Sequence, residues 1–373
     1  MVRMEQKLDP DVSTNGGALG TPAKVGNRWI RQSIGITVSI VCLVFVFHNV
    51  SMHDFLLALE HFDWAYLVIG VASLGFGYCM RIIRWAVMLR AAGGKVSNFG
   101  CAAPFLGSIA LNNVLPLRAG DIVRALVFPA ALGISRVTAT ASLLLERLVD
   151  LLTLLICLAL GMTLDRAAVM PKWLHEIATT LSLAGSVALL LIIFASPILA
   201  RLLLGFSDRI AAGRLARLRP GVGVAAELAA RISDMSRPRT LLMLFLLSML
   251  VWSGELGLYV CLLGGMGFGL SASAGLILMS MATLATLVPS SPGYVGPFHL
   301  AAAAAIDMLG GSHAQAASLS ILAHLSVWFP TTVAGVVAML VSRRLFQNVR
   351  SVSRASQNQL HDSASVSEPH DHQ

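Results

Sequence analysis

The sequence predicts an all-α, polytopic integral membrane protein. Of its 373 residues, 56% are hydrophobic and only 12% are charged, and the mean hydropathy is +0.76. Soluble domains carry roughly 25% charged residues, so this composition leaves little room for a soluble catalytic domain. Apolar stretches long enough to cross a bilayer recur, with arginines gathered between them. The net charge of +8 is therefore expected from cytoplasmic loops and not from nucleic-acid binding.

Length and hydropathy predict about six full spanning helices, because each crossing needs about 20 apolar residues. They are expected over residues 33–50, 64–80, 138–164, 177–198, 241–263 and 315–341. The polar segments 1–28 and 343–373 are expected to be disordered cytoplasmic tails, which leaves a transmembrane domain over residues 29–342. The five cysteines lie in apolar stretches without a C-x-x-C pair, so we expect small packing residues and no metal site.

The distribution of basic residues predicts the orientation. Lysines and arginines precede the first expected helix and follow the second, whereas residues 51–63 between them contain neither. The segment 201–239 carries eight arginines against three acids, which makes the loop 199–240 cytoplasmic and suited to anionic headgroups or to a partner protein. Both termini are then cytoplasmic, as expected of a multi-pass protein of a bacterial cytoplasmic (inner) membrane.

Two apolar segments are interrupted by helix breakers. The first, residues 98–135, contains Pro116, Gly120 and Pro129, and the second, residues 271–309, contains several prolines and glycines. The charge distribution requires each to leave on the side where it enters, so both are predicted to be re-entrant hairpins. Because they enter from opposite faces, inverted repeats are the simplest interpretation. The alternative, in which each half-segment is a full span, stays open.

The first break carries the motif NNVLPLRAGDIVR at residues 112–124. Polar groups at membrane depth face a partner, a cavity or a substrate. Asn112 and Asn113 can bond freed backbone groups or a ligand, and Arg118 and Arg124 suit a phosphate or carboxylate. Asp121 precedes Arg124 at a spacing that favours a neutralising pair on a helix. The structural alternative is a buried Asp121–Arg124 pair with Arg118 reaching the headgroups.

A second polar cluster is ERLVD at residues 146–150. Glu146, Arg147 and Asp150 can share one interior face of a long apolar helix, and an arginine of the first motif could balance their residual negative charge. Glu255 is a further acid deep in an apolar segment. These residues are predicted to balance charge or couple protons, with a purely structural ion cluster as the alternative.

The second break carries VPSSPGYVGPFH at residues 288–299. Ser290 and Ser291 are expected to cap the next half-helix, whose N-terminus would be an anion site. Gly293 and His299 complete this set of substrate-binding candidates, and His299 could titrate near neutral pH. The serines and His299 are also the only candidates for a nucleophile–base pair, which would make the protein an intramembrane transferase.

The first two motifs resemble those of the flippase-like family, which comprises the transmembrane region of lysylphosphatidylglycerol synthases and its stand-alone relatives, some associated with hopanoid lipids. That family shows N-x-x-L-P-x-R-x-G-[ED]-x-x-R, then E-R-x-x-D, then P-x-x-P-G-G-x-G-x-x-E. The third pattern is matched only in part, because Tyr294 replaces a glycine and His299 replaces the glutamate. Synthase members carry a soluble aminoacyl-transferase domain, for which this chain, ending at Gln373, leaves no room. The resemblance therefore implies lipid translocation alone.

The leading expectation is a transporter that moves an anionic or polyprenyl-derived lipid, such as a hopanoid, across or within the membrane. The alternative is a non-transporting scaffold that recruits a lipid-modifying or lipid-biosynthesis enzyme through the loop 199–240. No enzyme signature, metal-ligand cluster or phosphate-binding loop occurs in the sequence. We therefore expect no catalytic residues, no metal and no cofactor, with membrane lipids as the partners.

Overall fold

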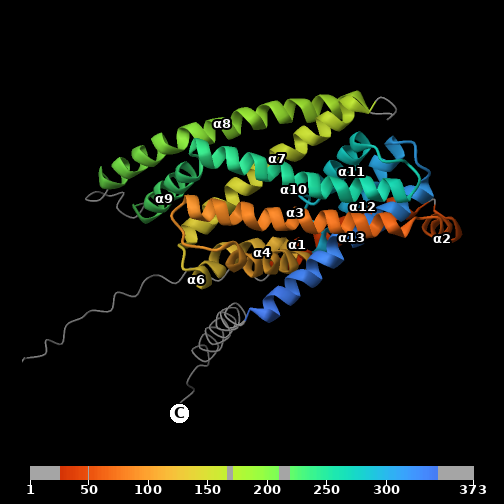
Figure 1. The fold of residues 1–373 in the computed structure, drawn as a ribbon, viewed down its shortest axis with the longest axis horizontal. Coiled ribbons are helices and arrows are strands. Elements are labelled where there is room, and N and C mark those ends of the chain that lie inside the picture. Colours follow the sequence, from red (N-terminus) through yellow and green to blue (C-terminus); the bar gives the residue numbers. More distant parts are fainter. Residues whose placement is uncertain (1–25, 49, 166–170, 210–218, 343–373) are drawn as a thin grey trace, which may run out of the picture.

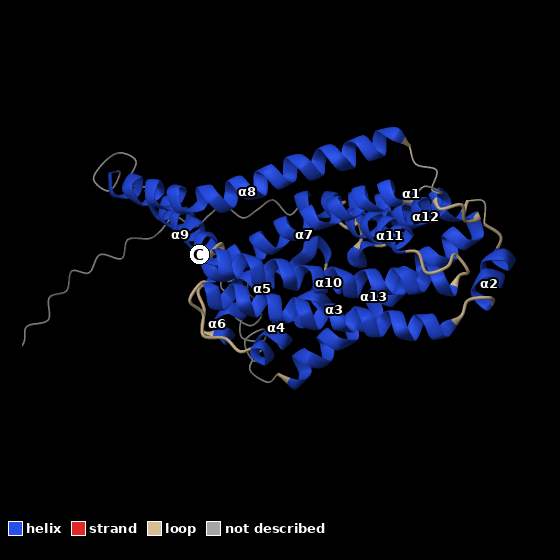
Figure 2. Ribbon diagram, turned by 45° about the horizontal axis from the view of Figure 1, so that its top comes forward, coloured by secondary structure: helices blue, strands red, loops and turns tan. Residues whose placement is uncertain are grey.

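The protein is helical throughout the part of the chain that its computed structural model describes, residues 26–48, 50–165, 171–209 and 219–342. Within these ranges the regular structure is α-helix and short 3-10 helix, without a strand (Figure 2). The predicted tails 1–28 and 343–373 lie almost entirely outside the described residues. The all-α prediction is confirmed.

All six segments predicted to span the membrane are helices. They are α1 (Gly26–Phe47), α3 (Trp64–Ala91), α7 (Arg136–Leu164), α8 (Lys172–Arg209), α10 (Pro238–Gly265) and α13 (His313–Val341). By length and hydropathy, four described helices can cross a membrane (α3, α8, α10 and α13), or up to five if α1 and α2 (Met52–Glu60), bent by 79°, form one span. The protein is a multi-pass membrane protein.

Helix α3 is longer than predicted. It begins at Trp64, where the Asp63 side chain accepts a hydrogen bond from the Ala65 N–H, and it continues to Ala91 instead of ending near residue 80. Arg81 and Arg84 therefore lie inside the helix and not in a cytoplasmic loop. Apolar residues lie on both sides of the two arginines, and the helix continues through them. The arginines lower the local hydropathy but do not end the helix, because both pair with acidic side chains.

Helices α3 and α10 pack together as an antiparallel pair along the long axis of the molecule (Figure 1). At one end the Asp63 N–H donates to the Gly265 carbonyl at 2.9 Å, and at the other Arg84 donates to the Ser248 hydroxyl at 3.1 Å. Midway, a Cβ on Gly254 would lie 2.6 Å from the Gly77 Cα. Only small residues allow this approach, which brings the two backbones into contact.

The first broken segment forms a helical hairpin. Helix α4 (Asn98–Val114) ends before Pro116, the 3-10 turn η1 (Pro116–Arg118) reverses the chain, and α5 (Ala119–Leu126) and α6 (Phe128–Leu132) return along α4. A Cβ on Gly120 would lie 1.9 Å from the Ser108 carbonyl oxygen, so glycine is what lets α5 close on α4. None of these arms reaches the length of about 20 residues that a full span needs.

The second broken segment forms a hairpin of the same kind. Helix α11 (Ala272–Ala285) is followed by a break that contains the 3-10 turn η3 (Pro292–Tyr294), and α12 (Pro297–Met308) packs back against α11. Its arms are also shorter than a span needs. Both predicted hairpins are therefore present as helix, break and returning helix.

The order of elements repeats with opposite direction. A 28-residue helix, a broken hairpin and a 29-residue helix follow each other first as α3, α4–α5 and α7, and again as α10, α11–α12 and α13. Because α3 and α10 are antiparallel, the hairpins that follow them start from opposite ends of the bundle. Packing is exchanged in the same way, with α4 against α13 and α11 against α7. This is the arrangement expected of inverted repeats.

The arginine-rich segment predicted as the loop 199–240 is largely helical. Helix α8 extends to Arg209 and runs along one edge of the bundle in both views (Figures 1 and 2), and α9 (Arg219–Met235) packs against α7 and α8. Arg231 on α9 donates to the carbonyl of Ala92, which follows α3, at 3.2 Å. The intervening residues 210–218 lie outside the described part of the chain.

Candidate functional site

A cavity of about 350 Å³ lies where the two hairpin tips meet inside the bundle. Its walls come from both hairpins and from α3, α7, α10 and α13. Of the residues predicted to bind substrate or balance charge, seven line it: Asn112, Asn113, Arg118, Arg147, Asp150, Glu255 and Gly293. Asp121, Arg124, Glu146, Ser290, Ser291 and His299 do not line this cavity. Polar groups at a junction of broken helices are the arrangement that membrane transporters use for substrate.

Arg118 reaches across from the first hairpin to the second. Its backbone is left-handed (φ 53°), and its guanidinium donates to the Thr286 carbonyl at 3.0 Å and to the Thr286 hydroxyl at 3.1 Å. The guanidinium carbon lies 5.5 Å from the centre of the Tyr294 ring. All of these partners are neutral. Among the described residues, Arg118 is the one arginine of the cavity without a carboxylate at ion-pair distance.

The two asparagines of the first motif hold the hairpin in place. The Asn112 side chain accepts from the Asp121 N–H at 3.1 Å and donates to the Asp121 carboxylate at 3.0 Å, so it joins the ends of α4 and α5. The Asn113 amide donates to the hydroxyls of Thr331 and Thr332 on α13. Both asparagines also line the cavity, so they can contact a ligand there while they shape its wall.

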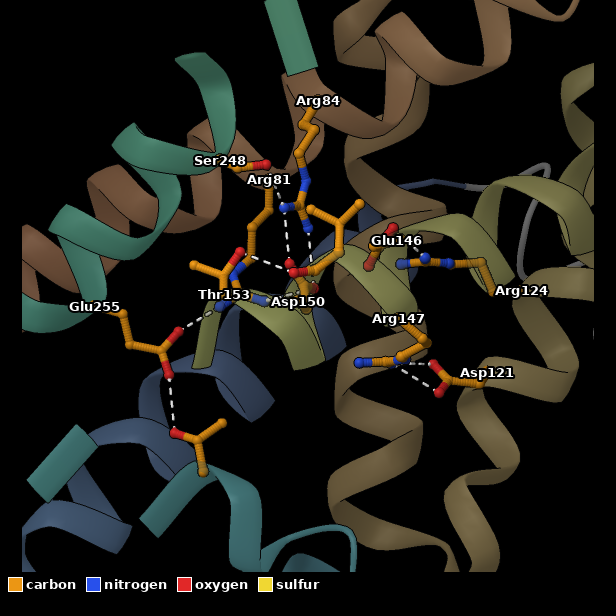
Figure 3. Close-up of polar contacts among 12 residues, drawn as sticks. Arg81, Arg84, Asp121, Arg124, Glu146, Arg147, Asp150, Thr153, Ser248 and Glu255 are labelled. Atoms are coloured by element: carbon orange, nitrogen blue, oxygen red, sulfur yellow. Dashed lines mark hydrogen bonds and ion pairs between the residues drawn. The ribbon is translucent and has the colours of Figure 1, made fainter. Parts of the chain in front are cut away.

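The predicted Asp121–Arg124 pair does not form. Asp121 instead accepts two hydrogen bonds from Arg147 on α7, at 2.7 and 2.8 Å (Figure 3). Arg124 turns the other way, to Glu146 on α7 at 2.5 Å. Because α5 is short and packs on α7, each charged residue of α5 finds a closer partner on that helix than on its own. Arg147 accordingly pairs with Asp121 and not with Asp150.

Arg124 is a buried structural cation and not an exposed ligand group. Its side chain is 1% exposed and that of Glu146 is 3% exposed. The guanidinium carbon lies 5.0 Å from the Trp85 ring centre and 4.8 Å from that of Phe105. These rings and Glu146 fill the space that a headgroup would need. An arginine of the first motif, Arg124, thus pairs with Glu146 of ERLVD, and it does not line the cavity.

A further charge cluster, which the sequence did not reveal, joins α3, α7 and α10. Arg84 donates to both oxygens of Asp150, at 2.8 and 3.0 Å, and Arg81 pairs with Glu255 (Figure 3). Arg81 and Glu255 stand at the same position counted from the start of their 28-residue helices. The signal in the sequence was two arginines at helical spacing with apolar residues on both sides, which is typical of paired intramembrane charges.

The residues of the second break seal the hairpin against α1. The Ser39 hydroxyl donates to the Val295 carbonyl at 2.7 Å and accepts from the Ser291 N–H at 3.0 Å. Ser290 and Ser291 line a second, adjoining cavity of about 200 Å³. Neither serine caps α12, as the sequence had suggested, because that helix begins only at Pro297 after Gly296. The Ser290 hydroxyl is buried and has no partner among the described residues.

His299 takes over the capping role. Its Nδ1 accepts from the Gly296 N–H at 3.3 Å, and its ring centre lies 4.7 Å from that of His324. His324 contacts the Gly293 carbonyl through Nε2 at 2.7 Å and lines the main cavity. The Ser291 hydroxyl donates weakly to Val295 O and not to His299. The transferase hypothesis therefore lacks a serine–histidine hydrogen bond in this geometry.

The charges of this region balance with one exception. Arg81, Arg84, Arg124 and Arg147 are each matched by one carboxylate, as Glu255, Asp150, Glu146 and Asp121. Within the described network Arg118 remains uncompensated. A charge in a low-dielectric interior is costly unless paired, so this site favours an anionic ligand. The described residues contain no group of His, Cys, Asp and Glu side chains that could hold a metal ion.

Residues 32–335 match a family model described as the lysylphosphatidylglycerol synthase TM region. The chain belongs to this family. Membership gives the protein a membrane role connected with lipids. Comparison with curated proteins and with solved structures found no match. Within this member of the family, residues of all three motifs line the cavity between the hairpin tips.

Proposed function

We propose that the protein moves a lipid with an anionic headgroup across the membrane through the cavity between the two hairpin tips. The observation that carries the proposal is the uncompensated Arg118, which faces this cavity from the tip of the first hairpin. A guanidinium binds a phosphate through paired, charge-assisted hydrogen bonds. Arg118 reaches only neutral oxygens of Thr286, and a phosphate is the stronger partner.

The remaining residues of the site take supporting roles. Polar contacts around the phosphate come from Asn112, Asn113 and Thr286. The aromatic residues that line the cavity, such as Trp252 and Trp328, accept the apolar part of the lipid near the headgroup. Glu255 is the acid that could couple translocation to protons, because it lines the cavity and its partner Arg81 lies on the opposite repeat. Glu146 is too deeply buried with Arg124 to serve this purpose.

The shared chemistry of the candidate cargoes is a phosphate on a lipid. A glycerophospholipid such as phosphatidylglycerol and a polyprenyl-derived lipid phosphate both offer it, whereas a neutral hopanoid does not. We place the protein in a bacterial cytoplasmic membrane with both termini in the cytoplasm, as the arginine distribution predicts. A lipid-biosynthesis enzyme that supplies the cargo remains a proposed partner.

A vesicle assay tests the proposal. The purified full chain is reconstituted into vesicles with a trace of phosphatidylglycerol that carries a fluorescent label on one acyl chain. Dithionite is added outside the vesicles to bleach the label in the outer leaflet. Translocation is read as loss of the inner-leaflet signal, which protein-free vesicles retain. We expect wild type to translocate the label and Arg118→Gln to be about tenfold slower or worse, the effect of losing a charged hydrogen-bonding partner.

The matched control is Arg90→Gln. Arg90 lies near the end of α3, where it donates to the Asn98 side chain at 2.8 Å, and it does not line the cavity. This variant should translocate at the wild-type rate. If wild-type vesicles retain the inner-leaflet signal for every phosphate lipid tested, transport is refuted and the scaffold function becomes the better explanation. Equal translocation rates for Arg118→Gln and Arg90→Gln would refute the role of Arg118.

A further inference from the structure

Two non-glycine residues in the described chain have a left-handed backbone, and they touch. Arg118 has φ 53° and Tyr294 has φ 62°, and the guanidinium carbon of the first lies 5.5 Å from the ring centre of the second. For a bulky residue such a φ is unusual and strained. Strained residues persist where the surrounding structure holds them, and they cluster at clamps and switch regions. Here each hairpin break contributes one of them.

The pair also stands between two spaces. Arg118 and Tyr294 line both the main cavity and the adjoining cavity beside Ser290 and Ser291. The main cavity extends from the hairpin tips to the charge cluster of Asp150 and Glu255, whereas the adjoining cavity is lined by residues of the two hairpin tips alone. A headgroup that passes from one to the other passes the residues that line both cavities, and this contact is among them.

The contacts that hold the pair together can be exchanged. Arg118 is bound by the Tyr294 side chain, through its ring and a side-chain hydrogen bond, and by two neutral oxygens of Thr286, and its side chain is only partly buried. A cation–π contact is weaker than a paired guanidinium–phosphate contact. An anion that reaches Arg118 therefore gains more than the ring loses. A zwitterionic headgroup, whose phosphate carries its own cation, gains less.

We propose that Tyr294 is the gate residue of this site, and that a lipid phosphodiester with net negative charge opens it by displacing the ring from Arg118. The inference rests on the proposed function, since it assigns a gate to the same cavity. A glycine or asparagine at position 294 accepts the left-handed backbone but cannot cover the guanidinium. Tyr294 therefore strains the backbone, but its ring controls access to the Arg118 guanidinium.

The test measures binding separately from transport. Purified wild type, Tyr294→Asn, Tyr294→Gly and Tyr294→Phe are melted in detergent while dioctanoyl-phosphatidylglycerol or dioctanoyl-phosphatidylcholine is titrated. We expect Asn and Gly to lower the half-saturating concentration of phosphatidylglycerol by about threefold to tenfold, the worth of the lost ring contact. They should lower that of phosphatidylcholine by no more than the same factor, because the phosphate of that lipid gains less from the uncovered Arg118. Phe keeps the ring cover and loses only the hydroxyl, so it should stay closer to wild type than to Gly.

Several outcomes separate the gate from transport itself. If Asn and Gly are folded without lipid and bind both lipids as wild type does, the gate is refuted even when the vesicles translocate lipid. If Phe behaves like Gly, the hydroxyl and not the ring cover is responsible, which also overturns the proposal. If wild type translocates no lipid but the binding differences appear as expected, transport fails and the gate over Arg118 stands.

Discussion

Arg118 and Arg124 belong to one motif, but their environments differ. Arg118 faces a cavity and contacts neutral oxygens, whereas Arg124 is enclosed by Glu146, Trp85 and Phe105. The sequence predicted both as phosphate ligands, because spacing alone cannot tell which arginine an adjacent helix will bury. The two environments differ because α5 packs on α7. Hydropathy does not predict which segments contact each other, so it did not predict this packing.

The burial of Arg124 predicts its effect on stability. Arg124→Met leaves the Glu146 carboxylate buried and unpaired, which should lower the free energy of unfolding by about 3–5 kcal/mol. The double variant with Glu146→Gln should recover most of this loss, because no buried charge remains. Unfolding by a denaturing detergent, followed by circular dichroism, measures both. Arg118→Met serves as the comparison and should lose less, since its partners are neutral and partly solvated.

The assignment of Arg124 would be contradicted by the opposite order. If Arg118→Met unfolds far more easily than Arg124→Met, then Arg118 is the structural cation.

The roles of the other site residues were predicted in part. Asn112 and Asn113 were expected at a broken backbone, and they do bond it and its neighbours. Arg81 and Arg84 were missed because a charge pair at helical spacing was interpreted as the end of a helix.

At the scale of the elements, close backbone contact between α3 and α10 carries the centre of the bundle. Gly77→Ala would place a Cβ 2.9 Å from the Val251 carbonyl oxygen, which forces the two helices apart. We expect a loss of about 1–3 kcal/mol in stability, the usual cost of overpacking. Gly75→Ala on the same helix meets nothing within 4 Å and should be neutral or stabilise by about 0.5–1 kcal/mol through helix propensity.

The same denaturation measurement distinguishes these two variants. Equal stability of Gly77→Ala and Gly75→Ala would mean that α3 and α10 do not approach as closely as described.

The existence of the helices and of both hairpins followed from the sequence, because prolines and glycines interrupt apolar runs at fixed places. The ends of elements did not. Helix α3 continues beyond its predicted end because Arg81 and Arg84 pair with Glu255 and Asp150. From hydropathy, the two arginines were assigned to a loop.

At the scale of the whole molecule, the distribution of basic residues predicts the orientation in the membrane. His53 lies between α1 and α3, and Lys95 lies between α3 and α4, and both are exposed. In a variant without the five native cysteines, His53→Cys should react with a membrane-impermeant maleimide added to intact cells. Lys95→Cys should react only after the membrane is opened, because its loop is expected to be cytoplasmic. The reverse pattern would invert the orientation.

The overall architecture was more predictable than the site. Opposite entry of the hairpins followed from counting charges, and inverted repeats were its simplest consequence. The pairing of α4 with α13 and of α11 with α7 did not follow, because it joins elements from different repeats. These exchanged contacts bring Arg118 to Thr286 and Tyr294, so the site between the tips is a property of the assembled pair of repeats and not of either motif.

The most direct measurement is an electron cryomicroscopy map of the full chain in nanodiscs that contain phosphatidylglycerol. We predict headgroup density in the cavity between the hairpin tips, with phosphate oxygens bonded to Arg118 and the Tyr294 ring displaced from the guanidinium. The same map in phosphatidylcholine nanodiscs should keep the ring over Arg118. Phosphate density confined to the surface, with Arg118 still bonded to Thr286 in anionic lipid, would contradict the central claim.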